Sequence, residues 1–143
     1  MVCWPSDIFA VPGVTWVNLQ YDECDRELRD ARDQFGVRFD ARWDWLDMMN
    51  DFDEVAALCC ALDLVVAPFN AVAMLCGALG VRTIATGNRF SWNTFGTDDL
   101  PWFRTVKTAL RTPPEDWDVV LARVVAEVNE VAACATPAVR SGA

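Results

Sequence analysis

The sequence predicts an α/β domain with a mostly parallel sheet, because short apolar segments suited to buried strands alternate with helical segments and short turns. The clearest strand covers residues 64–67, and Pro68 ends it because proline has no N–H to donate to a sheet. A helix over residues 71–79 follows at once. Asn70 is suited to cap its start, and Gly80 is suited to end it in the left-handed conformation.

This strand–turn–helix unit is typical of an anion-binding site. The first N–H groups of a helix have no partner within the helix and lie at the positive end of its dipole. Ligands of parallel sheets bind at the carboxyl ends of the strands, which is where the turn at Asn70 is expected. A plainer interpretation, in which Asn70 is an N-cap with nothing bound, stays open at this point.

The elements before this unit are expected in a regular order. Strands are expected over residues 14–19 and about 37–39, on either side of a helix over residues 22–35 that Gly36 ends. A buried helix over residues 55–62 comes next, preceded by an N-cap candidate and by carboxylates that favour a helix start.

The elements after the unit complete the sheet. Strands are expected over residues 82–85 and 106–110, separated by a long polar and aromatic loop over residues 87–102 of the kind that often carries function. The capping-box spacing of residues 112–115 predicts a last helix that ends near residue 133.

The length and charge bound the possible functions. The 143 residues suffice for one domain with a sizeable core, expected over residues 13–133, with a lead-in over residues 1–12 and a flexible tail over residues 134–143. The net charge of −9 argues against nucleic acid or an anionic membrane as a partner. Residues 22–54 hold twelve acidic and five basic side chains, hence −7 of this charge, so we expect the acidic surface to be local.

Cysteine usage and the absence of histidine bound the chemistry. No Cys-x-x-Cys spacing occurs and no signal peptide is visible, so reduced thiols and a cytoplasmic location are expected in preference to a disulfide framework. The six cysteines are Cys3, Cys24, Cys59, Cys60, Cys76 and Cys134. Without histidine, Ser-His-Asp and Cys-His catalysis are excluded, and a metal site is not expected.

Residues 55–81 are almost wholly apolar, which could suggest a membrane span. Asp63, Pro68 and Asn70 divide this stretch into pieces that are each too short to cross a bilayer. A buried helix–strand–helix explains these interruptions and is therefore the preferred interpretation.

Five motifs occur in an order that resembles the C-terminal, donor-binding half of GT-B fold glycosyltransferases. They are Pro-Gly-Val-Thr-Trp-Val-Asn-Leu-Gln (12–20), Asn-Asp-Phe-Asp-Glu-Val-Ala-Ala-Leu (50–58), Ala-Leu-Asp-Leu-Val-Val (61–66), Asn-Ala-Val-Ala-Met-Leu-Cys-Gly-Ala-Leu-Gly (70–80) and Pro-Trp-Phe (101–103). The likeness covers roughly residues 12–130 and is greatest to bacterial proteins in which tetratricopeptide repeats are fused to an O-GlcNAc-transferase-like or heptosyltransferase-like module. It implies a Rossmann-like three-layer domain that forms one half of a GT-B fold.

The resemblance also implies a donor site for a nucleotide-diphosphate sugar, with no metal. In the family, the helix start after the turn binds the diphosphate, so Asn70 would stand at the family's threonine and the N–H groups of Ala71 and Val72 would face phosphate. Gln20 resembles a polar residue that faces the donor, and the stretch from Met48 to Asp51 is similar to the segment that lines the nucleoside. The plainer interpretations are that Gln20 is a surface residue and that Met48 and Met49 fill the core.

Two positions depart from the family's pattern. Met74 stands where the family has histidine, and Phe69 stands where it has aspartate before the turn. GT-B enzymes also supply the acceptor site from an N-terminal half, so this chain is expected to transfer a sugar only together with such a half. The partners expected are a nucleotide sugar and either this half or a tetratricopeptide-repeat segment. The alternative is a degenerate, non-catalytic domain used for protein–protein contacts.

The long loop and the last strand offer further candidates. Trp92 and Trp102 could line a sugar site or could anchor the loop on the sheet. Arg104 and Lys107 could neutralise a diphosphate, although a solvated edge is the preferred interpretation.

Overall fold

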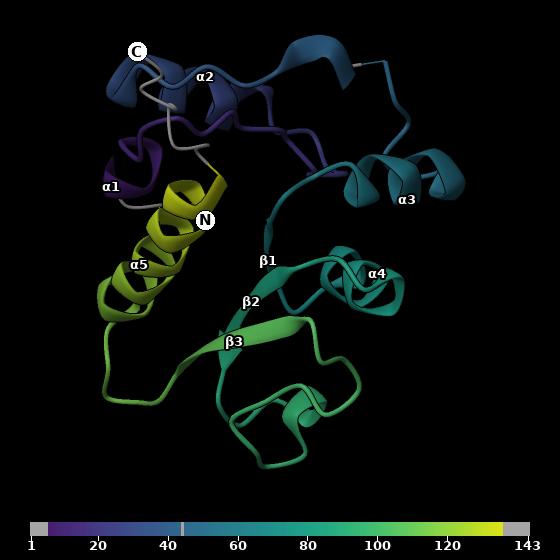
Figure 1. The fold of residues 1–143 in the computed structure, drawn as a ribbon. Helices are drawn as coiled ribbons and strands as arrows, with labels where there is room; N and C mark the ends of the chain where they lie inside the picture. The colour runs from purple at the N-terminus through teal and green to yellow at the C-terminus, as the bar shows by residue number, and fades with distance from the viewer. Residues whose placement is uncertain (1–5, 44, 136–143) are drawn as a thin grey trace, which may run out of the picture.

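A three-stranded parallel sheet lies at the centre of the computed structural model, which describes residues 6–43 and 45–135. The strands are β1 (Val65–Pro68), β2 (Thr83–Asn88) and β3 (Val106–Arg111), in that spatial order. The α-helices are α1 (Ser6–Phe9), α2 (Asp25–Phe35), α3 (Phe52–Cys60), α4 (Ala71–Leu79) and α5 (Trp117–Ala135), and the 3-10 turns are η1 (Ala41–Trp43) and η2 (Trp92–Thr94). The predicted α/β class and parallel sheet are confirmed (Figure 1).

The register brings equivalent ends of the strands together. Val65 pairs with Thr83, which pairs with Val106, so the three strands begin at the same edge of the sheet. At the other edge Pro68 pairs with Thr86, and β2 and β3 continue for two more pairs. The turn into α4 and the segments that follow β2 and β3 therefore share the carboxyl edge.

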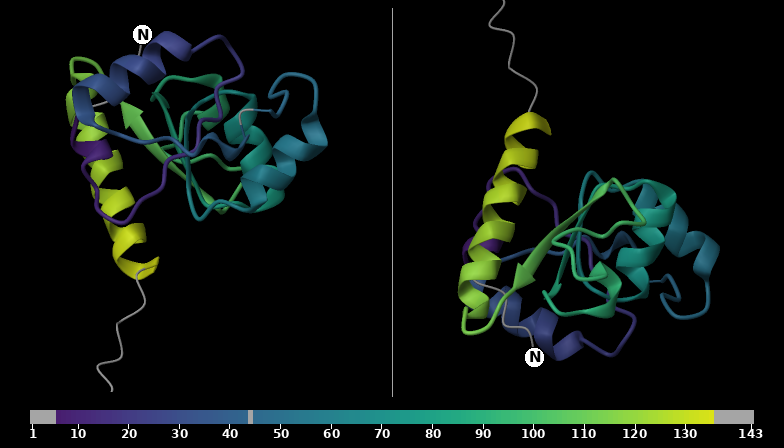
Figure 2. Two further views of the ribbon diagram at one scale, coloured as in Figure 1. Left: turned by 90° about the horizontal axis from the view of Figure 1, so that it is seen from above. Right: turned by 90° about the horizontal axis from the view of Figure 1, so that it is seen from below.

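Helices cover both faces of the sheet. Side chains alternate between the two faces of each strand, and apolar strand residues lie on both faces. Val65 and Ala85 face a core shared with α3 and α4, called here the α4-side core, whereas Val66 and Ile84 face a core shared with α1 and α5, called here the α5-side core. Figure 2 shows α5 on one side of the sheet and α3 and α4 on the other in both views.

Helix α4 has the predicted bounds and the predicted signals at both ends. Asn70 is extended, with φ −139° and ψ −173°, and its side-chain oxygen accepts a hydrogen bond from the Ala73 N–H at 3.2 Å. Gly80 ends the helix at φ +75°, where an L side chain would be strained. Gly36 ends α2 in the same way, at φ +66°.

The expectation of strands over residues 14–19 and 37–39 is wrong beyond a single parallel bridge between Trp16 and Phe39. The Asp40 N–H donates to the Trp16 carbonyl at 2.7 Å, but Asp40 then accepts from the Arg42 N–H and the chain turns into η1. The Gln20 N–H is likewise taken by the side-chain oxygen of Asn18, at 3.1 Å. Local side-chain bonds of this kind compete with a sheet ladder.

Residues 14–19 nevertheless keep the alternation of a strand. Val14 and Trp16 pack against the α5-side core, whereas Val17 and Leu19 pack against the α4-side core. The hydrophobic period of two therefore determined which side chains are buried on which face, even though the ladder did not form.

Several element ends differ from expectation. Helix α3 begins three residues earlier than expected, because Asp51 caps it by accepting from the Glu54 N–H at 3.4 Å. Strand β2 runs on to Asn88, which shortens the following loop. One hydrogen bond of the predicted capping box is present, since the Thr112 N–H donates to the Glu115 carboxylate at 3.3 Å. Helix α5 nevertheless begins only at Trp117.

The two ends of the chain pack differently from the expected lead-in and tail. Ile8 of α1 and Val11 are buried in the α5-side core, so the described part of the lead-in packs onto α5. Helix α5 includes residues 134 and 135 of the expected tail, and the rest of that tail lies outside the described residues.

Among the described residues, no helix is both long enough and apolar enough to cross a membrane. The five cysteines of this part of the chain are free thiols, and Cys59 and Cys76 are fully buried between α3 and α4. Cys3 lies outside the described residues.

Candidate functional site

The carboxyl edge of the sheet presents the start of α4 to solvent. Ala71 is exposed, and Ala71 and Val72 occupy the first two helical positions, whose N–H groups have no acceptor within a helix. The Asn70 cap satisfies the third position, Ala73, and the Asn70 carbonyl accepts from Met74 N–H at 3.2 Å. Two backbone donors at the positive end of the helix dipole are thus left for a ligand or for water.

The ring of Phe69 closes one side of this edge. A Cβ atom placed on Gly87 would lie 2.4 Å from Cδ2 of Phe69, so the ring packs directly on the backbone of β2. The Phe69 N–H meanwhile donates to the Thr86 carbonyl at 3.0 Å, which holds the residue against the strand. An apolar ring therefore stands where the glycosyltransferase-like pattern has a carboxylate.

Met74, at the position of the family's histidine, is half-buried and packs against the α4-side core. Its thioether offers at most a weak acceptor and no N–H donor. The described helix start thus relies on backbone N–H groups for any attraction to an anion.

Two arginines that the sequence analysis did not single out lie at the same edge, Arg89 directly after β2 and Arg111 as the last residue of β3. The Arg89 N–H donates to the Arg111 carbonyl at 3.0 Å, so the two backbones are adjacent. The Arg89 guanidinium forms an ion pair with Asp98 at 2.7 Å, whereas that of Arg111 donates to the Glu115 carbonyl at 2.8 Å. The position of Arg111 directly after the strand predicted over residues 106–110 was a signal that could have identified it, whereas Arg89 lies four residues beyond the predicted end of the strand over residues 82–85.

Arg104 and Lys107 lie at the opposite, amino edge of the sheet, because Arg104 precedes β3 and Lys107 is its second residue. Lys107 also forms an ion pair with Glu127 of α5, at 2.6 Å. These two cations are therefore unsuited to neutralise a diphosphate at Asn70.

The other predicted contacts come from separate segments that meet at the α4-side core. Met48 is half-buried and packs against that core, which includes Val72 of α4. Gln20 is exposed and directly follows Leu19, which packs against the same core. Asp51 is exposed as the cap of α3.

The described residues also form two hollows, neither of which is lined by the predicted site residues. One, of about 430 Å³, is open to solvent beside the Trp16–Phe39 bridge and is lined by residues 14–16 and 36–40 together with Phe9. The other, of about 140 Å³, lies along α3. Within the described residues, no three or more Cys, Asp or Glu side chains are grouped as a metal ion would require.

The aromatic loop between β2 and β3 exposes its largest rings. Trp92 is 77% exposed, and Trp102 is 59% exposed with its ring 5.2 Å from that of Phe95. The loop is instead anchored by Leu100 and Phe103, which pack on the α4-side core. The two tryptophans are therefore available to a ligand or partner.

Comparison with known proteins relates the chain to part of a longer bacterial protein. The sequence is 34% identical over 128 residues to Protein FlbA of Caulobacter vibrioides, and the match covers 88% of this chain and 21% of FlbA. This chain thus spans about a fifth of the length of that relative. No model of a known protein family matches the sequence. No solved structure matches it either.

Proposed function

We propose that this chain is the nucleotide-diphosphate-sugar-binding domain of a glycosyltransferase, Rossmann-like and equivalent to the C-terminal half of a GT-B fold. The observation that carries the proposal is the start of α4, where the Ala71 and Val72 N–H groups are left without helical acceptors at the carboxyl edge of a parallel sheet. The order of the five sequence motifs supplies the ligand class.

The proposed chemistry rests on the leaving group. When the bond from the sugar to the diphosphate breaks, negative charge develops on the phosphate oxygens, and N–H groups fixed in the backbone stabilise that charge without reorganising. The chain would supply the donor contacts, and an N-terminal half would supply the acceptor site and the base. Transfer would therefore require both halves.

The donor itself is expected to lie along the α4-side segments. Asn70 would orient the helix start, and Gln20 and the stretch from Met48 to Asp51 would contact the nucleoside and sugar. No metal takes part in this proposal, since the helix dipole and backbone N–H groups provide the positive potential.

A second candidate function is supported by Phe69 and Met74. Both side chains replace polar residues of the glycosyltransferase pattern, and both pack against the α4-side core. A domain that lost these groups could keep the fold for protein–protein contacts without binding a nucleotide.

The decisive measurement is thermal stabilisation by UDP, GDP, ADP and their sugars. A ligand in hundredfold excess over its Kd should stabilise the folded chain by about 2.7 kcal/mol. The key variant is Ala71→Pro, which removes one proposed donor N–H. Proline is well tolerated at the first helical position, and the extended conformation of Asn70 suits a residue that precedes proline.

We expect Ala71→Pro to keep the stability of the unliganded chain and to lose most of the nucleotide-induced shift. Arg29→Ala, on the exposed face of α2, serves as the control and should leave the shift unchanged. A shift that Ala71→Pro leaves intact would contradict the phosphate assignment. The absence of a shift with every nucleotide at millimolar concentration would favour the non-catalytic candidate.

A further inference from the structure

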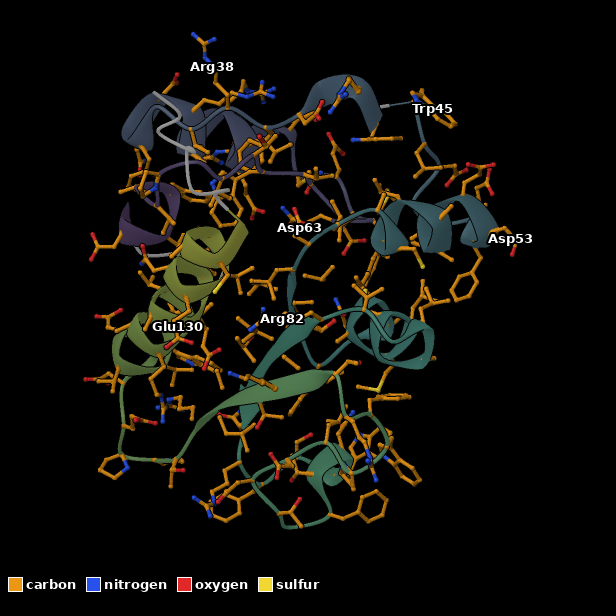
Figure 3. The ribbon with its side chains drawn as sticks, in the orientation of Figure 1. Arg38, Trp45, Asp53, Asp63, Arg82 and Glu130 are labelled. Atoms are coloured by element: carbon orange, nitrogen blue, oxygen red, sulfur yellow. The ribbon has the colours of Figure 1, made fainter. Side chains whose placement is uncertain are left out.

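The 140 Å³ hollow along α3 is an apolar groove on an acidic surface. One wall is a single face of the helix and its C-cap, since its members are spaced as residues i, i+3, i+4 and i+7. The lining residues are Trp43, Trp45, Leu46, Glu54, Ala57, Leu58 and Ala61. Figure 3 shows Trp45 on the connection that precedes α3, and Asp53 at the amino end of the helix.

The size of the hollow indicates what it could hold. Small-molecule sites have volumes of roughly 300–1,000 Å³, so a hollow of this size suits one large apolar side chain better than a whole ligand. Trp45 lines the hollow while 68% exposed, so its ring presents apolar surface beside the opening. Such a ring next to a pocket is typical of the anchor points of protein interfaces.

The charge around the hollow is predominantly negative. Residues 43–54 contain five carboxylates, and no Lys or Arg occurs between Arg42 and Arg82. Glu54 lies in the lining itself. The nearest cation in the sequence, Arg42, is paired with Asp40 and has its guanidinium carbon 5.9 Å from the Trp43 ring centre.

Local structure favours the ionised form of Asp47 and fixes the position of Asp51. Asp47 accepts hydrogen bonds from the Asn50 side chain at 2.9 Å and from the Met49 and Asn50 N–H groups at 3.0 Å. Asp51 accepts from the Glu54 N–H as the cap of α3. The negative potential beside the apolar hollow is therefore a fixed feature of this surface.

We propose that this groove docks a basic amphipathic segment of a partner protein, with one large apolar side chain in the hollow and Lys or Arg side chains over the carboxylates. Charge complementarity selects this occupant, because an acidic segment would place like charges against Glu54 in the lining and against Asp51 and Asp53 at the start of α3. The inference does not rest on the N–H groups at the start of α4, although Asp51 also belongs to the stretch proposed to contact the nucleoside.

The test uses two fluorescent amphipathic peptides of equal length, one of Leu and Lys and one of Leu and Glu. Binding to the full chain is measured by anisotropy at low and high salt. We expect the Lys peptide to bind at least about tenfold more tightly than the Glu peptide, and to weaken as salt screens the rim charges.

Matched variants separate the groove from general acidity. Glu54→Lys and Glu130→Lys change the charge equally, but Glu130 lies on α5 at the far side of the molecule (Figure 3). We expect Glu54→Lys to lower the affinity for the Lys peptide by roughly tenfold, and Glu130→Lys to lower it by roughly twofold or less. Trp45→Ala should weaken binding by roughly tenfold, whereas Trp92→Ala, at an equally exposed ring, should not.

Three results would overturn the proposal. Equal effects of Glu54→Lys and Glu130→Lys would mean nonspecific attraction by the net charge. Equal affinity for the two peptides would mean that charge does not select the occupant. A dimer in sedimentation equilibrium that Trp45→Ala converts to a monomer would mean that the groove is covered by a second copy of this chain.

Discussion

The ring of Phe103 lies directly on Gly77 of α4, so closely that a Cβ atom placed on Gly77 would be 2.4 Å from Phe103 Cδ2. Phe103 comes from the loop that joins β2 to β3, and Gly77 is buried within the helix. This contact anchors the aromatic loop to the α4-side core, and it explains why a glycine is found inside a helix whose other residues are small or apolar.

Gly77→Ala should destabilise the fold because the added methyl group must displace Phe103. Overpacking of a core typically costs about 1–3 kcal/mol, which exceeds the roughly 1 kcal/mol by which alanine is favoured over glycine in a helix. Urea denaturation measures the difference. In a Phe103→Leu background the same substitution should cost less, and equal costs in the two backgrounds would show that the two residues are not coupled.

Asn70→Asp should separate stability from nucleotide binding. Aspartate caps a helix as well as asparagine does, and its charge suits the helix dipole, so the fold should be as stable as the wild type. The same charge would repel a diphosphate at the Ala71 and Val72 N–H groups and should abolish the nucleotide-induced shift in Tm.

Asn70→Ala is the companion variant. Loss of the cap should destabilise the unliganded chain by about 1 kcal/mol, measured by denaturation without nucleotide. If Asn70→Asp binds nucleotide as well as the wild type does, the diphosphate does not lie at this helix start.

Asp47 should make stability depend on acid pH. Hydrogen bonds from the Asn50 side chain and from the Asn50 and Met49 N–H groups lower the pKa of this carboxyl from its ordinary value. The folded state therefore favours the ionised form. The resulting stability is present above the ordinary pKa and is lost as the pH falls through the lowered one.

Asp47→Asn should accordingly lower Tm at neutral pH. The difference in Tm between the variant and the wild type, called here the Tm gap, should narrow as the pH falls. Thermal melts followed from neutral to acid pH measure this gap. Asp33→Asn, at an exposed carboxylate of α2, should show no comparable narrowing. A Tm difference between Asp47→Asn and the wild type that does not change with pH would contradict a stabilising role for the ionised Asp47 carboxylate.

The exposed thiol Cys60 and the buried thiol Cys76 should differ sharply in reactivity. Cys59 and Cys76 are fully buried, whereas Cys60 is exposed. The hydrogen bond with the Cys59 thiol, together with burial, raises the pKa of Cys76, so the Cys76 thiol stays neutral and shielded. Iodoacetamide followed by mass spectrometry should label Cys60 in the folded chain and label Cys76 only after denaturation. Equal labelling rates would mean that α3 and α4 separate readily.

The site could be predicted only where it is local. Asn70, Ala71 and Val72 are consecutive, and an N-cap after a proline-terminated strand identifies the helix start from neighbouring residues alone. The positions of Phe69 over Gly87 and of Arg89 beside Arg111 depend on strand register, which no short stretch of sequence specifies.

The sequence by itself determined the order of the helices and strands from α3 to α5, the bounds of α4 and the faces on which side chains are buried. These features depend on periodicity, caps and proline, which act within a few residues. Tertiary structure decided which apolar segments became strands. Residues 14–19 have the strand pattern, but Asn18 and Asp40 bond locally and leave a single bridge. Tertiary structure also decided that Trp45 and Trp92 are exposed, because a close-packed core is filled by other side chains and leaves no space for them.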